Sequence, residues 1–179
     1  MERIFSDFQL YDSVKEETIL KYKGKVPLEI IKIWKNYGFG TFLNGYLKVI
    51  NPDDYREIID ESYARKDVAI PIFATAMGDV ITWEENQYLM LIKYRKGILK
   101  GLSFKYFFLD LADKSFIEEE LDCKQYNFAV EKYGVPEFDE CFGHTPILGM
   151  GGAEKGENLK KVKLKEHIYL ITQFKGPIE

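Results

Sequence analysis

The sequence predicts an α+β protein in which an antiparallel β-meander, at about residues 69–109, is flanked by N-terminal and C-terminal helices. Two observations predict this class. The spacing of apolar residues changes from helical to alternating near Ala69 and returns to helical near Asp113. The alternating segments are also short and joined by tight polar turns, whereas parallel strands would need long crossover connections.

The first part of the chain is predicted to be mainly helical. Residues 1–26 favour helix, and Pro27 suits the first position of a second helix because its missing N–H is not needed there. Gly38 is a typical helix stop. The second helix has one apolar stripe at helical spacing, which makes Trp34 a core residue. The stripe consists of Ile30, Ile31, Trp34 and Tyr37.

A Gly-rich turn and a short strand, ending near Asn51, are predicted to follow. Asn51 can cap the next helix and Pro52 can take its first position, so a helix is expected from Pro52 to about Ala64. Its inward stripe is Tyr55, Ile58, Ile59 and Tyr63. Its outer side is acidic, with Asp53, Glu57, Asp60 and Glu61.

The acidic outer side of this helix is a candidate partner-binding surface, formed by Asp53, Glu57, Asp60 and Glu61, with Tyr46 as a neighbouring aromatic contact. A binding surface needs complementary charge and aromatic anchors rather than a precise reactive geometry. The alternative is a face of charges that is simply solvated.

Four strands are expected next, over residues 69–76, 80–83, 88–94 and 98–102. Pro71 in the first of them indicates a sheet edge or a bulge, because proline cannot donate a ladder hydrogen bond. Helices are then expected at 113–121 and at 124–133, with Gly134 ending the second.

The C-terminal part is expected to contain a Gly-rich loop over residues 143–156 and a last helix over 164–174. The inward side of that helix would carry Leu164, Ile168, Ile171 and Phe174 or Lys175. A strand is the alternative there, because residues 168–172 are rich in β-prone side chains.

Composition narrows the class of protein. The 179 residues are 46% hydrophobic and 15% aromatic, enough for one domain or two tightly joined lobes with an aromatic core. A net charge of −4 argues against direct binding of nucleic acid, which favours a basic surface. The N-terminus lacks the apolar region of a signal peptide and no run is long enough to span a membrane, so a cytoplasmic protein is expected.

One segment could carry reactive chemistry. Cys141 and His144 have a plausible metal-ligand spacing, and a Cys–His hydrolase is a possible alternative. A structural zinc site needs four ligands, and only Cys123 and His167 could add to the pair. We therefore expect no metal, no cofactor and no catalytic residue, and a chain that is not an enzyme.

A second alternative is a small-ligand or nucleotide-binding regulatory module built on the loop from Gly149 to Gly152. Glycine lets backbone N–H groups converge on an anion. Five lysines follow the loop and could attract phosphate, namely Lys155, Lys160, Lys161, Lys163 and Lys165. The loop matches neither the dinucleotide-binding nor the P-loop pattern, which favours a solvated loop.

Two sets of motifs are spread over nearly the whole chain. The N-terminal motifs are Val26–Leu28, Trp34, Gly38, Asn44–Leu47, Asn51–Tyr55, Ile70–Ile72 and Thr75–Asp79. The C-terminal motifs are Phe128, Ala129, Gly134, Asp139–Gly143, Pro146–Gly152 and Gln173–Gly176. With these motifs, the N-terminal part resembles the GAD-like (GAD-related) domain, and the C-terminal part resembles the C-terminal domain of Tdi-type type VI secretion immunity proteins. A more distant resemblance is to the SUKH class of immunity proteins, with its Pro-started helix, Trp and Asn-Gly turn.

The resemblance implies an immunity protein that binds and neutralises a cognate bacterial toxin in the cytoplasm. It implies a GAD-like domain over residues 1–105 and an immunity domain over 106–179, packed as one compact unit. A nuclease toxin is expected, because its basic substrate cleft would suit an acidic binder. The shared motif residues are expected to determine the fold rather than to react: Pro27, Trp34, Gly38, Gly45, Pro52, Gly78, Gly134, Gly151 and Gly152.

Overall fold

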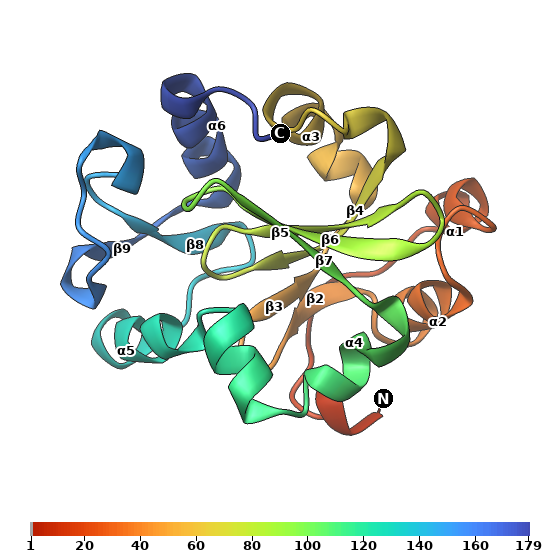
Figure 1. Ribbon diagram of the computed structural model, residues 1–179. Helices are drawn as coiled ribbons and strands as arrows, with labels where there is room; N and C mark the ends of the chain where they lie inside the picture. Colours follow the sequence, from red (N-terminus) through yellow and green to blue (C-terminus); the bar gives the residue numbers. More distant parts are fainter. Residues whose placement is uncertain (1) are drawn as a thin grey trace.

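The computed structural model describes residues 2–179 and is built around a seven-stranded antiparallel sheet in which the strands follow one another in chain order (Figure 1). This confirms the α+β class and the meander. The strands are β1 (Gln9–Asp12), β2 (Phe39–Phe42), β3 (Leu47–Val49), β4 (Ala69–Thr75), β5 (Val80–Glu84), β6 (Tyr88–Lys93) and β7 (Ile98–Leu102).

The sheet is wider than the sequence predicts. It begins at Gln9 rather than near residue 69, and it ends at Leu102, after which helix α4 occupies residues that were expected in the sheet. The expectation of a helical 1–26 segment is wrong in part, because β1 lies within it. All four residues of β1 are exposed, so this strand carries no alternating apolar pattern.

Helices cover both faces of the sheet. Four of them, α1, α2, α4 and α5, pack on one face, and α3 and α6 pack on the other (Figure 1). An apolar cluster fills each of the two interfaces. The helices are α1 (Glu16–Tyr22), α2 (Leu28–Tyr37), α3 (Arg56–Ser62), α4 (Phe104–Asp110), α5 (Cys123–Tyr133) and α6 (Leu164–Lys175). Short 3-10 turns lie at Glu2–Phe5, Pro52–Tyr55, Lys66–Val68, Leu148–Met150 and Gly156–Asn158, and a π-turn at Phe116–Glu120.

Helix α2 places Trp34 in the core, where it is 1% exposed and meets Tyr22 and Phe39 edge to face. The helix ends at Gly38, which has a φ of 84°. A Cβ atom there would also lie 2.7 Å from the carbonyl oxygen of Asp12, so this turn requires glycine for two reasons.

Helix α3 begins as its sequence indicates. The Asn51 side chain accepts a hydrogen bond of 3.2 Å from the backbone N–H of Asp53, and Pro52 opens a 3-10 turn that leads into the helix. The expected inward residues of this segment are each exposed by 4% or less: Tyr55, Ile58, Ile59 and Tyr63. The amphipathic pattern was therefore sufficient to orient the helix.

Strand β4 contains the irregularity that Pro71 indicates. It lies between β3 and β5, and its register with β5 shifts between Pro71 and Phe73. Of the two expectations for this proline, the bulge is confirmed and the sheet edge is wrong.

The Gly-rich C-terminal segment contains two strands that the sequence does not reveal. β8 (Glu140–His144) and β9 (Leu159–Lys163) pair antiparallel, so the expected loop over 143–156 is wrong at its first residues. The backbone N–H of Phe142 donates to the carbonyl of Ala76 at 2.7 Å, which joins this pair to the end of β4.

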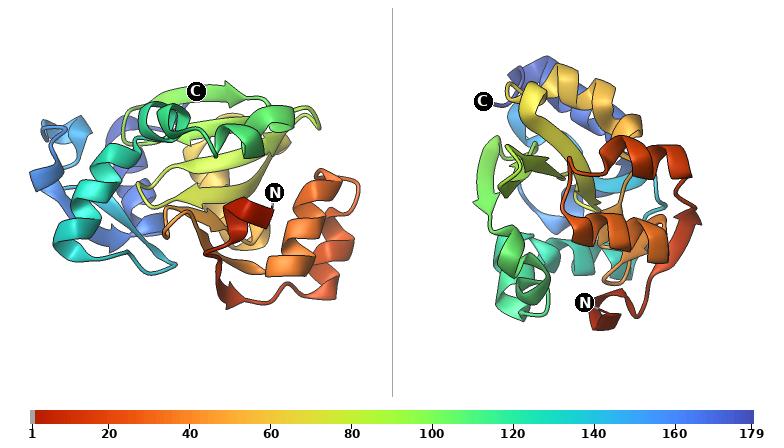
Figure 2. Two further views of the ribbon diagram at one scale, coloured as in Figure 1. Left: turned by 90° about the horizontal axis from the view of Figure 1, so that it is seen from below. Right: turned by 90° about the vertical axis from the view of Figure 1, so that its right-hand side faces the viewer.

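The last helix is confirmed as helical, and the strand alternative is wrong. Its buried side is Leu164, His167, Ile168 and Ile171. Phe174, expected on that side, is 55% exposed. Figure 2 shows α5 and the β8–β9 pair at one end of the molecule, and α1 and α2 at the other.

The C-terminal residues return to α3. The backbone N–H of Ile178 donates to the carbonyl of Ser62 at 2.9 Å, and that of Ala64 donates to the carbonyl of Ile178 at 3.0 Å. The carboxyl end of the chain is thereby held against the end of α3, as Figure 1 shows.

Other glycines of the shared motifs occupy special backbone positions. Gly45, Gly78, Gly134 and Gly151 have φ values of 79°, 80°, 73° and 82°. Gly152 has no such value, but a Cβ atom there would lie 2.0 Å from the carbonyl oxygen of Pro146.

Candidate functional site

The carboxylates expected on the outer side of α3 are exposed, but two of them are already engaged. Asp53 accepts hydrogen bonds from Lys21 Nζ at 2.5 Å and from the Tyr22 hydroxyl at 2.6 Å. Asp60 accepts one from Arg56 Nε at 3.0 Å, one helical turn away. These internal pairs lower the charge that the two aspartates present to a partner.

Glu57 and Glu61 are also exposed, and neither forms an ion pair within residues 2–179. They lie one turn apart on α3, next to Tyr169 of α6. Burial raises the pKa of Tyr169, and the negative charges of Glu57, Glu61 and Glu166 raise it further. The four residues therefore form one negatively charged surface across two helices.

Helix α6 also carries exposed apolar side chains, on its flank away from α3. Glu166, Leu170 and Phe174 are spaced by four residues and so follow one side of the helix. Leu170 is 40% and Phe174 55% exposed. We call the surface formed by Glu57, Glu61, Glu166 and Tyr169 the acidic face; Leu170 and Phe174 lie beyond Glu166 on α6.

Tyr46 does not belong to any exposed surface, so its assignment as a partner contact is wrong. It is 0% exposed, packs against Tyr126 with ring centroids 5.0 Å apart, and donates its hydroxyl hydrogen to the carbonyl of Leu121. Tyr46 instead joins the sheet to the segment before α5. Tyr46 lies in the turn just before β3, where no alternating pattern predicts which way its side chain points.

The contribution of α6 could not be predicted locally, because α3 and α6 are far apart in the sequence. Periodicity alone predicted Phe174 or Lys175 on the buried side of α6, whereas Phe174 is exposed.

Cys141 and His144 are both buried, at 0% and 2% exposure. Burial raises the pKa of the Cys141 thiol to about 12, which is opposite to the shift that a nucleophilic thiolate needs. Within residues 2–179, no three His, Cys, Asp or Glu side chains gather in a way that could hold a metal ion.

The backbone N–H groups of the Gly149–Gly152 loop form hydrogen bonds within the loop itself. The backbone N–H groups of Met150 and Gly152 both donate to the carbonyl of Ile147, and that of Gly151 donates to Leu148. Those donors are no longer directed at an anion.

The lysines that follow the loop do not surround it either. Lys161 donates to the carbonyl of Val135, and Lys163 pairs with Asp139. These contacts give the small-ligand alternative no support.

A buried charge network joins the main sheet to the C-terminal segment. Nη2 of Arg95 donates to Asp79 at 3.2 Å and to Asp122 at 2.6 Å. Asp122 also accepts from Lys93 and Lys96, both at 2.9 Å. Asp79 lies in the β4–β5 turn and Arg95 follows β6, whereas Asp122 precedes α5, so the network links distant parts of the chain.

Several atoms around this network have no hydrogen-bond partner within the described part of the chain. They include Oδ1 of Asp79, Nε and Nη1 of Arg95, and both ring nitrogens of His144. Burial raises the pKa of the Asp79 carboxyl, although Arg95 opposes this shift. In a buried network that is only partly hydrogen-bonded, the loss of one more partner should cost a large free energy of folding.

His167 packs next to the network and should make the protein sensitive to acid. Burial, followed by the effects of His144 and Arg95, lowers the pKa of His167 to about 4. Below pH 6.5 the unfolded chain binds a proton that the folded chain does not. The free energy of unfolding should therefore fall by about 1.4 kcal/mol per pH unit between pH 6.5 and 4 on account of His167.

The measurement is urea unfolding at several pH values for the wild type and for His167→Gln, which has no such titration. The variant should show a smaller slope with pH over this range. Equal slopes would contradict the assignment.

Helices cover both faces of the sheet, so this is an α+β protein whose candidate site is an exposed, charged surface. Residues 3–94 match the model of the GAD-like domain, and residues 102–175 match that of the T6SS immunity protein Tdi1, C-terminal. The chain belongs to the GAD-like family, and its C-terminal part is similar to a type VI secretion immunity domain.

A solved structure shares the fold. The crystal structure of Atu4351 from Agrobacterium tumefaciens aligns with a TM-score of 0.75 and 17% sequence identity, covering 96% of this chain and 88% of that one. No match was found among curated proteins. Within residues 2–179, no helix combines the length and apolar character needed to cross a membrane.

Proposed function

We propose that this protein neutralises a cognate type VI secretion toxin by binding it through the acidic face, without catalysis of its own. The observation that carries the proposal is the match of residues 102–175 to a type VI immunity domain. The acidic face supports it, because an aromatic side chain beside unpaired carboxylates is typical of recognition surfaces.

The toxin in this proposal is a nuclease. Enzymes that act on nucleic acid carry basic surfaces for phosphate. Glu57, Glu61 and Glu166 would meet such a surface with opposite charge, which speeds association and helps select the partner. The protein's own net charge of −4 supports a role as the acidic partner rather than as a nucleic-acid binder.

The absence of catalysis is part of the proposal, supported by the state of the reactive groups. Cys141 is buried with a raised pKa, and His144 is buried beside Arg95, which together with burial lowers its pKa. Neutralisation by binding needs neither group. We also propose that residues 1–105 and 106–179 act as one unit in the cytoplasm of the producing cell.

Charge reversal of the acidic face should slow association with the toxin. Changing Glu57 and Glu61 together to lysine should lower the association rate on the order of tenfold at low salt. The two reversals make the charge of the face more positive by four units, which weakens its attraction for a basic partner. The difference should shrink as salt screens the field. Stopped-flow mixing with the toxin domain of an effector from a neighbouring gene, at low and high salt, measures it.

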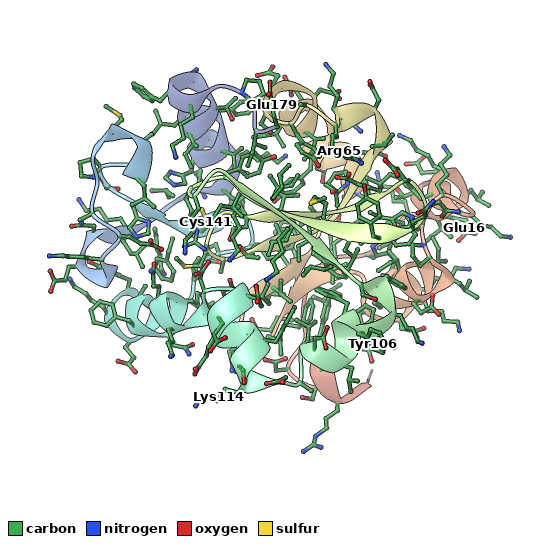
Figure 3. All side chains as sticks on the ribbon, viewed as in Figure 1. Glu16, Arg65, Tyr106, Lys114, Cys141 and Glu179 are labelled. Atoms are coloured by element: carbon green, nitrogen blue, oxygen red, sulfur yellow. The ribbon has the colours of Figure 1, made fainter. Side chains whose placement is uncertain are left out.

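The matched control is the reversal of Glu16 and Glu17 on α1, on the other side of the molecule from α6 in Figure 3, where Glu16 is labelled. It changes net charge equally but leaves the acidic face intact. Both pairs should leave thermal stability nearly unchanged, since exposed charges contribute little. Equal slowing by both pairs would show that net charge, rather than this face, is responsible.

A further inference from the structure

A pocket of about 250 Å³ lies beside the acidic face, between β1, the start of α3 and the first turn of α6. Glu166 belongs both to the pocket and to the acidic face. The residues that matter here are three aromatic ones, Tyr11, Tyr55 and Phe138, and three carboxylates, Asp54, Asp139 and Glu166.

An exposed aromatic pair forms one wall of the pocket. Tyr11 is 65% exposed, and its ring stacks on that of Phe138 with centroids 4.2 Å apart and an angle of 15° between planes. The stack holds the Tyr11 ring in place from one side, while most of the Tyr11 side chain stays exposed. Rigid, accessible aromatic side chains are the usual anchors of protein interfaces.

On the opposite wall, the ammonium group of Lys165 lies against Tyr55. Nζ of Lys165 lies 4.9 Å from the centre of the Tyr55 ring and donates to the backbone carbonyl of Asp54 at 2.5 Å. The ammonium of Lys165 therefore leaves the carboxylate of Asp54 uncompensated. This arrangement shows that the pocket is suited to positive charge.

Within residues 2–179, two of the three carboxylates of the pocket form no ion pair, although the Lys165 ammonium also lines it. Asp139 pairs with Lys163 at 2.7 Å, but Asp54 and Glu166 form no ion pair in the described part of the chain. Burial raises the pKa of Tyr55, and Cys141, Asp54 and Asp139 raise it further.

The wall that carries Phe138 is held rigidly by Lys48. This lysine is 0% exposed, and its Nζ donates to three backbone carbonyls, of Glu137 at 2.7 Å, Phe138 at 2.9 Å and Glu140 at 2.5 Å. A buried ammonium on β3 thus positions the segment from the other half of the chain. Little ordering entropy would be lost when a ligand enters such a prepared site.

We infer that this pocket binds the guanidinium group of an arginine side chain presented by the toxin. The inference rests on the proposed function. Arginine suits the pocket better than lysine, because its planar group can stack on Tyr11 while its N–H fork pairs with a carboxylate such as Glu166. Contact at the pocket would hold the complex after the acidic face has guided its approach.

The first experiment tests the pocket alone, with Nα-acetyl-arginine methylamide as the probe and the citrulline analogue as its neutral isostere. In an NMR titration, the amides of Tyr11, Phe138 and Glu166 should shift saturably with the arginine compound and not with citrulline. Tyr11→Ala should weaken binding about two- to fivefold. Equal responses to both compounds, or none, would overturn the inference.

The control is Tyr106→Ala, which removes another exposed tyrosine, labelled on α4 in Figure 3. Tyr106 is 48% exposed and also has a lysine above its ring, since Lys105 Nζ lies 5.0 Å from the centroid. It should leave the titration unchanged. Both tyrosines are on the surface, so neither change should unfold the protein.

The second experiment separates this inference from the proposed function. Tyr11→Ala should raise the dissociation rate of the complex with the neighbouring effector domain by about tenfold or more, as loss of an interface anchor does. If the wild type binds the effector and Tyr11→Ala dissociates at the same rate, the pocket proposal fails and the proposed function stands. If the wild type does not bind it, the proposed function fails, while the arginine titration still decides the pocket.

Discussion

Replacement of Arg95 by alanine is expected to lower the free energy of unfolding by about 3–5 kcal/mol, the cost of leaving a buried charge without its partner. Arg95 is 4% exposed, and the carboxylate that it would abandon, Asp79, is 0% exposed. Asp122 would keep Lys93 and Lys96, so Asp79 bears most of the loss. Urea unfolding followed by circular dichroism, with linear extrapolation, measures the change.

Two further variants serve as controls for this result. Lys25→Ala, at an exposed position, should stay within about 0.5 kcal/mol of the wild type. Changing Arg95 to methionine together with Asp79 to leucine should cost less than the sum of the single changes, because it removes both buried charges. A loss for Arg95→Ala no larger than that for Lys25→Ala would show that the network contributes nothing to folding.

Replacement of Trp34 by alanine should cost about 3–5 kcal/mol as well, for a different reason. The indole is 1% exposed and meets Tyr22 and Phe39 edge to face, so its removal leaves a cavity between α1, α2 and β2. Thermal unfolding should show a much lower midpoint.

Leu28→Ala provides the control on the same helix. Leu28 is 62% exposed, so its truncation leaves no cavity and should change the midpoint little. If the two variants melted alike, Trp34 would not be the packing centre that its burial indicates.

The elements that could be predicted from the sequence are those with enough residues to show a period. The apolar stripe of the Pro27–Gly38 segment and the alternation between residues 69 and 102 led to α2 and to β4–β7. β1 and β2 have four residues each, which is too short for a period to emerge. β3 has three residues and was expected because of the turn residues that flank it. β9 carries three lysines among its five residues, so it does not resemble a buried strand.

Only part of the candidate site could be predicted from the sequence. The acidic residues of α3 were recognisable because they alternate with its apolar stripe. Their pairing with Lys21 and Arg56, and the position of α6 beside them, depend on contacts between distant segments. No local pattern indicates such contacts, so the sequence could show which residues are exposed on one helix but not which surface they build together.

The carboxyl end of the chain determines how this protein should be tagged. Because Ile178 is hydrogen-bonded to Ser62 and Ala64, any peptide attached after Glu179 would emerge beside α3 and next to the acidic face. An affinity tag or fluorescent fusion placed there would crowd the proposed toxin contact and could imitate a loss-of-binding variant. A fusion ahead of Glu2 avoids this, since the first turn of the chain lies across the molecule from α3 in Figure 1.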